Sequence, residues 1–488
     1  MLFNSFQYGI FISIIFILYW LVPSAYKWIM LLGASLYFYL CFKPMYLILL
    51  VGMIMISYVC GILIERFDDV RRKRIVISTS IILFVSTLFL FKYVGFTGNI
   101  LSHFVPNIGI ELSEFSKKLI MPIGISFYTF QILGYIIDVY RGRISAEKHF
   151  GYYALFVSFF PQIASGPIGR ADKLLCQYRN PIAFNKKIAY EGLILIIIGF
   201  YKKLVIADML TVYVDKVFDN PHAYTGGALL TASVFFTIQV YCDFSGYSDI
   251  AIGSARLLGI EFIENFRSPY LSSTIKEFWS RWHISLSTWF RDYVYISMGG
   301  NRCSKLRRDI NTLVTFVVSG IWHGANWTFI IWGMIHGLGQ IVENHLPSFL
   351  RKKSEGHIWG AMQVAVWLLR VGIVCVFCSF AWIFFRANTL KEALYIIVNI
   401  PKGILKVGNY IREGLGSVGI LGNIRLAYIG ILMIVLMGCD ILNYDGKISE
   451  RIYKLPTVVR IIVMSAFIAF TIVFAQKGVA AEFVYIQF

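Results

Sequence analysis

Long apolar runs that contain no charged residue constrain the fold of this chain more than any other feature. Residues 75–91, 226–241 and 461–475 form three such runs, and each approaches the ~20 residues that an α-helix needs to cross a bilayer. Of the 488 residues, 58% are hydrophobic and only 15% are charged, which is too little charge for the surface of a soluble protein. We therefore predict an all-α membrane protein that crosses the bilayer many times.

The apolar runs also set the expected number of membrane elements. Further candidate spans lie at 6–22, 29–42, 45–64, 192–200, 312–321, 364–385 and 426–442. Together the runs predict roughly ten or eleven transmembrane helices, with poorly fixed boundaries. The first run has no basic segment before it and no small-residue cleavage site after it, so we interpret it as a retained span rather than a signal peptide.

We interpret residues 1–488 as one domain. The length of the apolar runs, and how often they are interrupted, changes twice along it. Residues 1–95 carry four plain apolar helices, and residues 360–488 return to ordinary spans. Between them, at 119–345, the apolar runs are short and are broken by Gly, Pro and charge, as in MPIG at 121–124. Broken backbone at membrane depth is tolerated only where protein buries it or where it lines a cavity. We therefore expect re-entrant or interfacial helices around a central funnel or tunnel.

The basic residues lie mostly in short loops between the apolar runs. Lys and Arg number 45 against 27 Asp and Glu, a formal net charge of +18, and the densest basic cluster falls at 66–74. Because positively charged loops stay on the cytoplasmic side of a membrane, we predict that this loop and those at 302–308 and 351–353 are cytoplasmic. The N-terminus and the stretch 95–116 then lie outside. No cysteine and histidine spacing typical of a metal site occurs, so no metal is expected.

The segment EFWSRWHISLSTWFRDY at 277–293 carries aromatic residues at spacings of three and four. A single helix here would place Trp279, Trp282 and His283 on one face and Arg281 on the other, which is typical of a helix at the membrane boundary. The spacing alone favours a histidine satisfied by a local carbonyl over a functional one.

The segment SGIWHGANWTFIIWGMIHG at 319–337 places another histidine in an apolar, glycine-rich setting. Gly320 and Gly324 flank His323, and small residues at this spacing let neighbouring helices approach closely. A buried neutral imidazole could accept a proton from a hydroxyl or thiol, and an interhelical hydrogen bond is the equally weighted alternative. In a straight helix His336 would lie well round from His323, so we expect a structural role for it.

Two acids, Asp243 and Asp249, occur among small residues in YCDFSGYSD at 241–249. They could line a polar cavity or orient a histidine, although a helix end at the membrane interface is the slightly favoured interpretation. The remaining histidines lie in polar surroundings and are expected at the surface: His103, His149, His222, His345 and His357.

At these motifs the sequence resembles the membrane-bound O-acyltransferase family, in particular the branch that contains the alginate O-acetylation membrane protein. The matching stretches, in order, are MPIGISFYTFQILGYIIDVYRG (121–142), FFPQIASGPI (159–168), YCDFSGYSDIAIG (241–253), NFRSPYLSSTIKEFWSRWHISLSTWFRDYVYI (265–296), SGIWHGANWTFIIWGMIHG (319–337), WIFFRANTLKEAL (382–394) and FVYIQF (483–488). The resemblance implies a helical fold around a funnel or tunnel that pierces the membrane. It also implies an acyltransferase that uses acyl-CoA or another cytoplasmic thioester as its donor.

The same resemblance implies roles for individual residues. His323 matches the family's active-site histidine, and His283 matches a second histidine thought to lie on the cytoplasmic side near the donor. Donor-binding residues are not fixed by the motifs, and the candidates are Trp279, Arg281, Trp282 and Asn326. The Asn326 amide and the tryptophan N–H groups are also candidates to donate hydrogen bonds to an oxyanion.

These expectations combine into a membrane O-acetyltransferase of the bacterial cytoplasmic membrane that passes an acetyl group from acetyl-CoA toward an extracytoplasmic polysaccharide. Members of the branch usually work with a separate extracytoplasmic partner of the Ser-Asp-His esterase type (SGNH), and this chain has no GxSxG or GDS segment of its own. One alternative is D-alanyl transfer from a carrier protein to teichoic acid. Another, from a different class, is a membrane transporter or export channel, which the absence of a detectable internal repeat disfavours. No nucleic-acid partner is expected.

Overall fold

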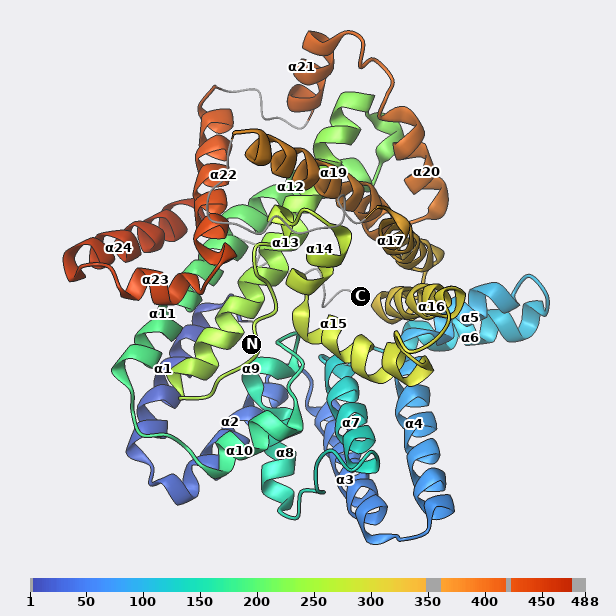
Figure 1. Ribbon diagram of the computed structural model, residues 1–488, viewed down its shortest axis with the longest axis vertical. Coiled ribbons are helices and arrows are strands. Elements are labelled where there is room, and N and C mark those ends of the chain that lie inside the picture. Colours follow the sequence, from blue (N-terminus) through green and yellow to red (C-terminus); the bar gives the residue numbers. More distant parts are fainter. Residues whose placement is uncertain (1–2, 348–360, 418–422, 476–488) are drawn as a thin grey trace. The chain divides into compact units, whose positions relative to one another are not determined.

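The computed structural model describes residues 3–347, 361–417 and 423–475, and every regular element in this part of the chain is a helix (Figure 1). Among the described residues, five helices are long and apolar enough to cross a membrane: α3 (Pro44–Arg66), α4 (Val70–Lys92), α13 (Gly226–Leu257), α19 (Ala361–Arg386) and α24 (Thr457–Phe474). Two shorter apolar helices are α1 (Phe6–Leu21) and the Tyr428–Tyr444 part of α22 (Asn423–Tyr444). The predicted all-α, multi-pass membrane class is confirmed, while the total of ten or eleven spans stays a prediction.

The chain folds into two compact units. The first holds the described residues of 1–196 and 247–263, and the second holds those of 197–246 and 264–484. The division falls inside α11 (Lys186–Phe200) and inside α13, so each of these helices contributes to both units. The single domain with a core at 119–345 stays a prediction.

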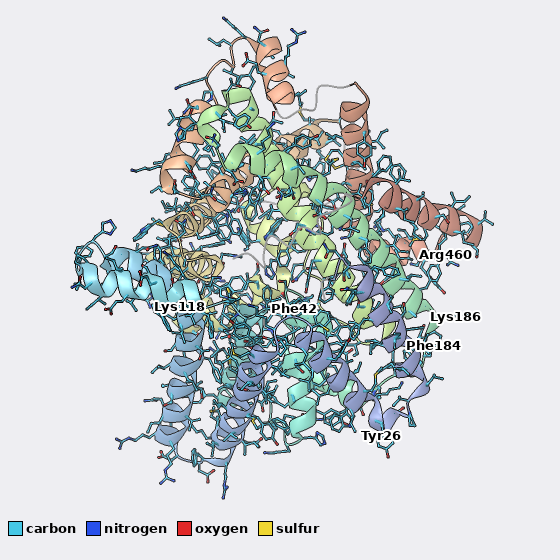
Figure 2. The ribbon with its side chains drawn as sticks, turned by 180° about the vertical axis from the view of Figure 1, so that it is seen from behind. Tyr26, Phe42, Lys118, Phe184, Lys186 and Arg460 are labelled. Carbon is cyan, nitrogen blue, oxygen red and sulfur yellow. The ribbon has the colours of Figure 1, made fainter. Side chains whose placement is uncertain are left out.

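The first unit opens with the four apolar helices predicted for its N-terminal part: α1, α2 (Lys27–Leu40), α3 and α4. Ser5 and Asp69 begin α1 and α4, because each side chain accepts a hydrogen bond from a backbone N–H of the first turn, which satisfies a donor that the helix itself cannot. Exposed Tyr26 lies at the turn between α1 and α2, and Lys118 marks the end of α6 (Figure 2). The other helices of this unit are η1 (Ser24–Tyr26), α5 (Val94–Leu101), α6 (Pro106–Lys118), α7 (Ile125–Tyr140), α8 (Phe150–Ser158), α9 (Phe160–Ile163) and α10 (Ala171–Arg179).

The glycine and proline breaks of the first unit pack against one another. Gly124 precedes α7 with φ 74°, and a Cβ atom there would lie 1.9 Å from the carbonyl oxygen of Ile163, so only glycine fits. Gly169 is approached by two buried glutamines, since its Cβ would lie 2.7 Å from Gln162 Oε1 and 3.3 Å from Gln131 Nε2. The broken backbone of the first unit is therefore buried by protein, one of the two outcomes that its sequence predicts.

The second unit contains the segments that carry the predicted site. Its helices besides α13, α19, α22 and α24 are η2 (Tyr201–Ala207), α12 (Asp208–Phe218), η3 (Pro221–Ala223), η4 (Pro269–Leu271), α14 (Ile275–Arg281), α15 (Ile284–Phe290), η5 (Arg291–Tyr295), η6 (Ile296–Met298), α16 (Lys305–His323), α17 (Trp327–His345), α20 (Leu390–Asn399), α21 (Val407–Ser417) and α23 (Ile448–Tyr453). Two of them, η2 and η5, have the wider π-helical winding, which is rare and frequent at functional sites.

Helices α16 and α17 form a tight antiparallel hairpin (Figure 1). A Cβ at Gly320 would lie 2.3 Å from the carbonyl oxygen of Phe329, and one at Gly333 would lie 2.4 Å from that of Phe316. Gly320 and Gly333 thus let the two backbones touch. The sequence predicts this close approach for Gly320 and Gly324. A Cβ at Gly324 would instead meet the ring of Phe329 rather than a backbone, and Gly333 was not predicted. A single helix over 319–337 is wrong, because the backbone is extended at Gly324, which ends α16.

A buried ion cluster corrects the interpretation of Asp243 and Asp249 as markers of a helix end. Both residues lie inside α13, which runs on to Leu257. The Asp243 carboxylate lies 2.6 Å from the Lys203 ammonium, and that ammonium lies 2.7 Å from Asp208. Because a lysine forty residues earlier supplies the opposite charge, the acid can lie inside the protein and the helix need not end.

The surface histidines are confirmed within the described residues. His103, His149, His222 and His345 are exposed. The fifth, His357, lies outside the described part of the chain.

Candidate active site

His323 is the last residue of α16, and its ring lies among aromatic side chains. Its ring centroid lies 4.8 Å from that of Trp322, 5.0 Å from that of Trp332 and 5.3 Å from that of Phe385. The residue is only 4% exposed. The aromatic rings therefore keep water away from most of the imidazole, which is the setting expected for a base that acts on a bound substrate.

Asn326 stabilises the turn that follows His323. Its side-chain oxygen accepts a hydrogen bond from the backbone N–H of Thr328 and caps α17, while its Nδ2 donates to the carbonyl of Asn388 at 2.8 Å. The amide thus ties the turn to the segment after α19. Its use in donor binding or as an oxyanion donor stays a prediction.

His336 lies close to the surroundings of His323, contrary to the expectation from a straight helix. The Trp332 ring lies 5.0 Å from the ring of His323 and 5.0 Å from that of His336. The chain reverses direction between α16 and α17, so the angle of a continuous helix does not apply. His336 also accepts a hydrogen bond at Nδ1 from Trp279 Nε1, 3.3 Å away.

His283 breaks the segment that the sequence predicts as one helix. Its backbone is left-handed (φ 42°, ψ 54°) and separates α14 from α15. The buried ring packs against the rings of Phe244 and Phe266 at 4.6 and 6.4 Å. Burial lowers the pKa of His283 to about 3, because the charged form loses its hydration. The imidazole is therefore neutral near pH 7.

The polar face predicted for the same segment is buried at Arg281 and Ser285, while its location at the membrane boundary stays a prediction. Arg281 is only 6% exposed, pairs with Glu277 at 3.0 Å and stacks on the ring of Tyr444 at 4.0 Å. Ser285 donates from its hydroxyl to the side-chain oxygen of Asn265. The polar groups found partners inside the protein, which a helical projection of the sequence cannot show.

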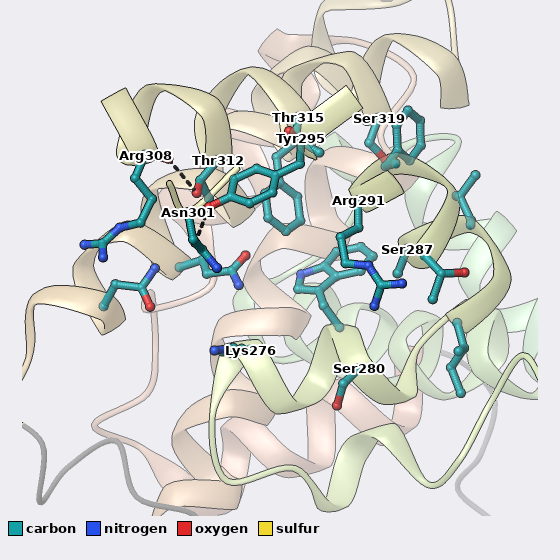
Figure 3. A pocket seen from close by; sticks show the side chains of 18 residues that line it. Lys276, Ser280, Ser287, Arg291, Tyr295, Asn301, Arg308, Thr312, Thr315 and Ser319 are labelled. Carbon is teal, nitrogen blue, oxygen red and sulfur yellow. Dashed lines mark hydrogen bonds between the residues drawn. The ribbon is translucent and has the colours of Figure 1, made fainter. Parts of the chain in front are cut away.

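A cavity of about 650 Å³ opens against α14, α15, η5, α16 and α17 (Figure 3). Three cationic side chains line it: Lys276, Arg291 and Arg308. Figure 3 shows the Arg291 side chain reaching between the segments that carry Ser280 and Ser287. Two acids that do not line the cavity, Asp292 and Asp309, lie 2.9 and 3.8 Å from Arg291 and Arg308. The lining therefore carries positive charge that nearby acids balance only in part.

The lining also contains aromatic side chains. It includes Trp279 and Phe316, whose ring centroids lie 5.2 Å apart, and Ser319, four residues before His323 in α16. The cavity thus combines cationic groups with aromatic rings on helices α14 and α16, and α16 ends at the predicted catalytic histidine. Such a space suits a ligand with an anionic part and a small apolar part.

The structure separates the four candidates for donor binding. Trp279 lines the cavity, whereas Arg281 is engaged with Glu277, and the Trp282 ring packs at 5.0 Å against that of Trp382. Sequence reasoning missed three cations of the lining: Lys276, Arg291 and Arg308. Arg308 could have been found, since it lies in the basic stretch 302–308 predicted to be cytoplasmic, but nothing in the sequence places Arg291 in the same cavity.

Known proteins match this chain over the residues that line the cavity. The sequence model of the membrane-bound O-acyltransferase family matches residues 143–385. A probable alginate O-acetylase of Azotobacter vinelandii is 38% identical over 380 residues, which are 77% of this chain and 73% of that protein. The peptidoglycan O-acetyltransferase of Helicobacter pylori is 36% identical over 398 residues, or 76% of this chain and 72% of its own. A teichoic acid D-alanyltransferase of Bacillus subtilis is 30% identical over 285 residues, or 56% and 70%.

Proposed function

Since this chain belongs to the membrane-bound O-acyltransferase family, we propose that it transfers an acetyl group from cytoplasmic acetyl-CoA toward an extracytoplasmic polysaccharide. The chain is a multi-pass membrane O-acyltransferase. Five points go beyond this family-level activity and are proposed: the acetyl-CoA donor, the direction of transfer, the location in a bacterial cytoplasmic membrane, the SGNH-type partner and the polysaccharide acceptor. Relatives named as alginate and peptidoglycan O-acetylating enzymes support an acceptor that offers sugar hydroxyl groups.

The cavity carries the proposal for the donor. Acetyl-CoA joins several phosphate charges to a small thioester, and the cavity offers Lys276, Arg291 and Arg308 together with aromatic side chains. Guanidinium groups bind phosphate oxygens through charge-assisted, paired hydrogen bonds. A donor held by its phosphates among these cations would direct its thioester toward Trp279 and Ser319.

The chemistry proposed for His323 is general base catalysis. The imidazole takes the proton of the attacking hydroxyl while that oxygen bonds to the thioester carbonyl carbon, and the carbonyl oxygen becomes an oxyanion. Collapse of this intermediate re-forms the carbonyl and breaks the C–S bond, so that coenzyme A leaves as a thiolate and receives the proton from the imidazolium. The step yields an acetyl ester and coenzyme A, and requires no other reactant.

The donor assignment can be tested with the purified full-length protein in lipid nanodiscs. We expect acetyl-CoA to be consumed and coenzyme A released, measured by chromatography, whereas an acetylated or D-alanylated carrier protein should not serve. Replacing Arg291→Gln should raise the KM for acetyl-CoA about tenfold, the effect of losing one charge-assisted hydrogen bond. The matched control is Lys391→Gln, which removes an exposed cation of α20 that does not line the cavity.

Two results would contradict the proposal. Turnover with the D-alanylated carrier protein but not with acetyl-CoA would move the chain to the D-alanyl branch, and turnover with only the acetylated carrier protein would replace acetyl-CoA as the donor. Absence of any thioester consumption, together with movement of a polysaccharide across the membrane, would favour a transporter.

A further inference from the structure

A hydrogen bond between two buried rings connects the cavity wall to a histidine with no role in the proposed chemistry. Trp279 of α14 donates from Nε1 to His336 Nδ1 of α17 across 3.3 Å. His336 is fully buried and Trp279 is 9% exposed. The bond therefore joins two helices in a place that water does not reach.

The chemistry of this bond fixes the state of the histidine. An indole N–H can only donate, so Nδ1 of His336 must be the acceptor, and the neutral ring then carries its proton on Nε2. Nε2 is buried and has no hydrogen-bond partner among the described residues, which costs free energy. The surrounding rings, among them Phe278, Phe316 and Phe377, would accommodate a phenyl ring without that cost. What the imidazole adds at this position is the acceptor for Trp279.

The position of Trp279 gives the bond a consequence for the site. Trp279 lines the cavity, and its ring lies 5.8 Å from that of Trp332, which in turn lies 5.0 Å from the ring of His323. One ring, that of Trp332, therefore separates the indole from the predicted base. In the proposed donor complex the thioester must lie within reach of His323, so the acyl end of the donor would lie on the side of Trp279.

From this geometry we infer that His336 is a positioning residue, which holds Trp279 as the inner wall of the cavity and so aligns the thioester for attack. The inference rests on the proposed function, since it takes the cavity to be the donor site. It predicts that loss of the bond lowers kcat while donor affinity, set by the cations, remains unchanged.

Two single variants and their combination test the inference on the full-length protein with acetyl-CoA. His336→Phe keeps a ring but removes the nitrogen that accepts the hydrogen bond. Trp279→Phe keeps a ring but removes the N–H that donates it. Each should lower kcat about tenfold, the effect of one lost buried hydrogen bond, with less than a twofold change in the Kd for acetyl-CoA. The double variant should match either single variant, because both remove the same interaction. Additive losses would overturn the inference.

A conservative variant separates positioning from packing. His336→Asn places an amide oxygen near the position of Nδ1 but leaves a void, so it should unfold at a lower temperature than His336→Phe while retaining a higher kcat. If His336→Phe has both the higher unfolding temperature and the higher kcat of the two variants, His336 has only a structural role. The ¹⁵N–¹H signal of the Trp279 indole, assigned by its loss in Trp279→Phe, should shift in His336→Phe. An unchanged signal overturns the inference, whereas failure of the wild type to bind acetyl-CoA refutes the proposed donor alone.

Discussion

His283 shows how much a single residue can depend on its backbone. Its left-handed conformation separates α14 from α15, and in a residue other than glycine such a conformation is uncommon and held by its surroundings. The family resemblance identified the residue, but the break could not be predicted, because the helical spacing of aromatic residues continues through it. Glycine would have marked the turn in the sequence, and histidine gives no such signal.

His283 does not line the cavity, and a role in donor handling rests on the family resemblance. We predict on that basis that His283→Ala impairs donor handling, and it should also destabilise the protein. The left-handed conformation costs an L-residue about 1–2 kcal/mol, and histidine already bears most of that cost. The destabilisation therefore comes mainly from the void that the buried ring leaves, and it must be separated from the loss of the imidazole's function.

Asparagine tolerates the left-handed region but is smaller than the buried imidazole, so His283→Asn should lose acetyl-CoA binding or turnover while lowering the unfolding temperature less than His283→Ala. Binding, turnover and thermal unfolding of both variants are the measurements. Full activity of His283→Asn would show that the imidazole is not used.

At the scale of elements, the sequence predicted where helices lie from local patterns, but it did not predict which distant residues contact one another. The four N-terminal helices follow from apolar runs and their boundaries, and Gly320 of α16 predicted close packing. The sequence could not show that Lys203 pairs with Asp243 inside the protein, because that contact joins residues forty positions apart. The same limit hid the meeting of His336 with the surroundings of His323, which depends on the reversal of the chain after α16.

The α16–α17 hairpin yields a prediction with an internal control. A methyl group at Gly320 or Gly333 would collide with backbone atoms of the opposing helix, so Gly320→Ala and Gly333→Ala should each destabilise the protein by about 1–3 kcal/mol or more. Both should also reduce acyl transfer, because His323 ends α16. Gly372→Ala in α19, which meets no atom within 4 Å, should leave stability and transfer intact. The close packing would be contradicted if all three variants had the same unfolding temperature and the same rate of acyl transfer.

At the scale of the whole molecule, the membrane class followed from composition, and the two compact units did not. No linker or change of composition marks the division, since it falls inside α11 and α13. Periodicity describes each helix by itself and contains no information on which distant helices share a unit. Orientation in the membrane, in contrast, is encoded in the loops and can be tested directly.

The basic loop at 66–74 predicts that the N-terminus is extracytoplasmic. In a variant from which the eight native cysteines have been removed, single cysteines at positions 5 and 69 should react differently with a reagent that cannot cross the membrane. Intact cells should label Ser5→Cys and leave Asp69→Cys unlabelled until the membrane is permeabilised. The opposite pattern would invert the topology and the proposed direction of transfer.

The most direct test of the account is the acyl transfer rate of His323→Ala, measured as coenzyme A released from acetyl-CoA by the purified protein with acceptor present. Loss of a general base should lower kcat by a factor of about 10² to 10⁴, while the variant still inserts, purifies as a single species and binds acetyl-CoA. His103→Ala, which removes an exposed histidine of the first unit, should transfer at the wild-type rate. Near-normal transfer by a well-folded His323→Ala variant would contradict the central claim that His323 is the catalytic base.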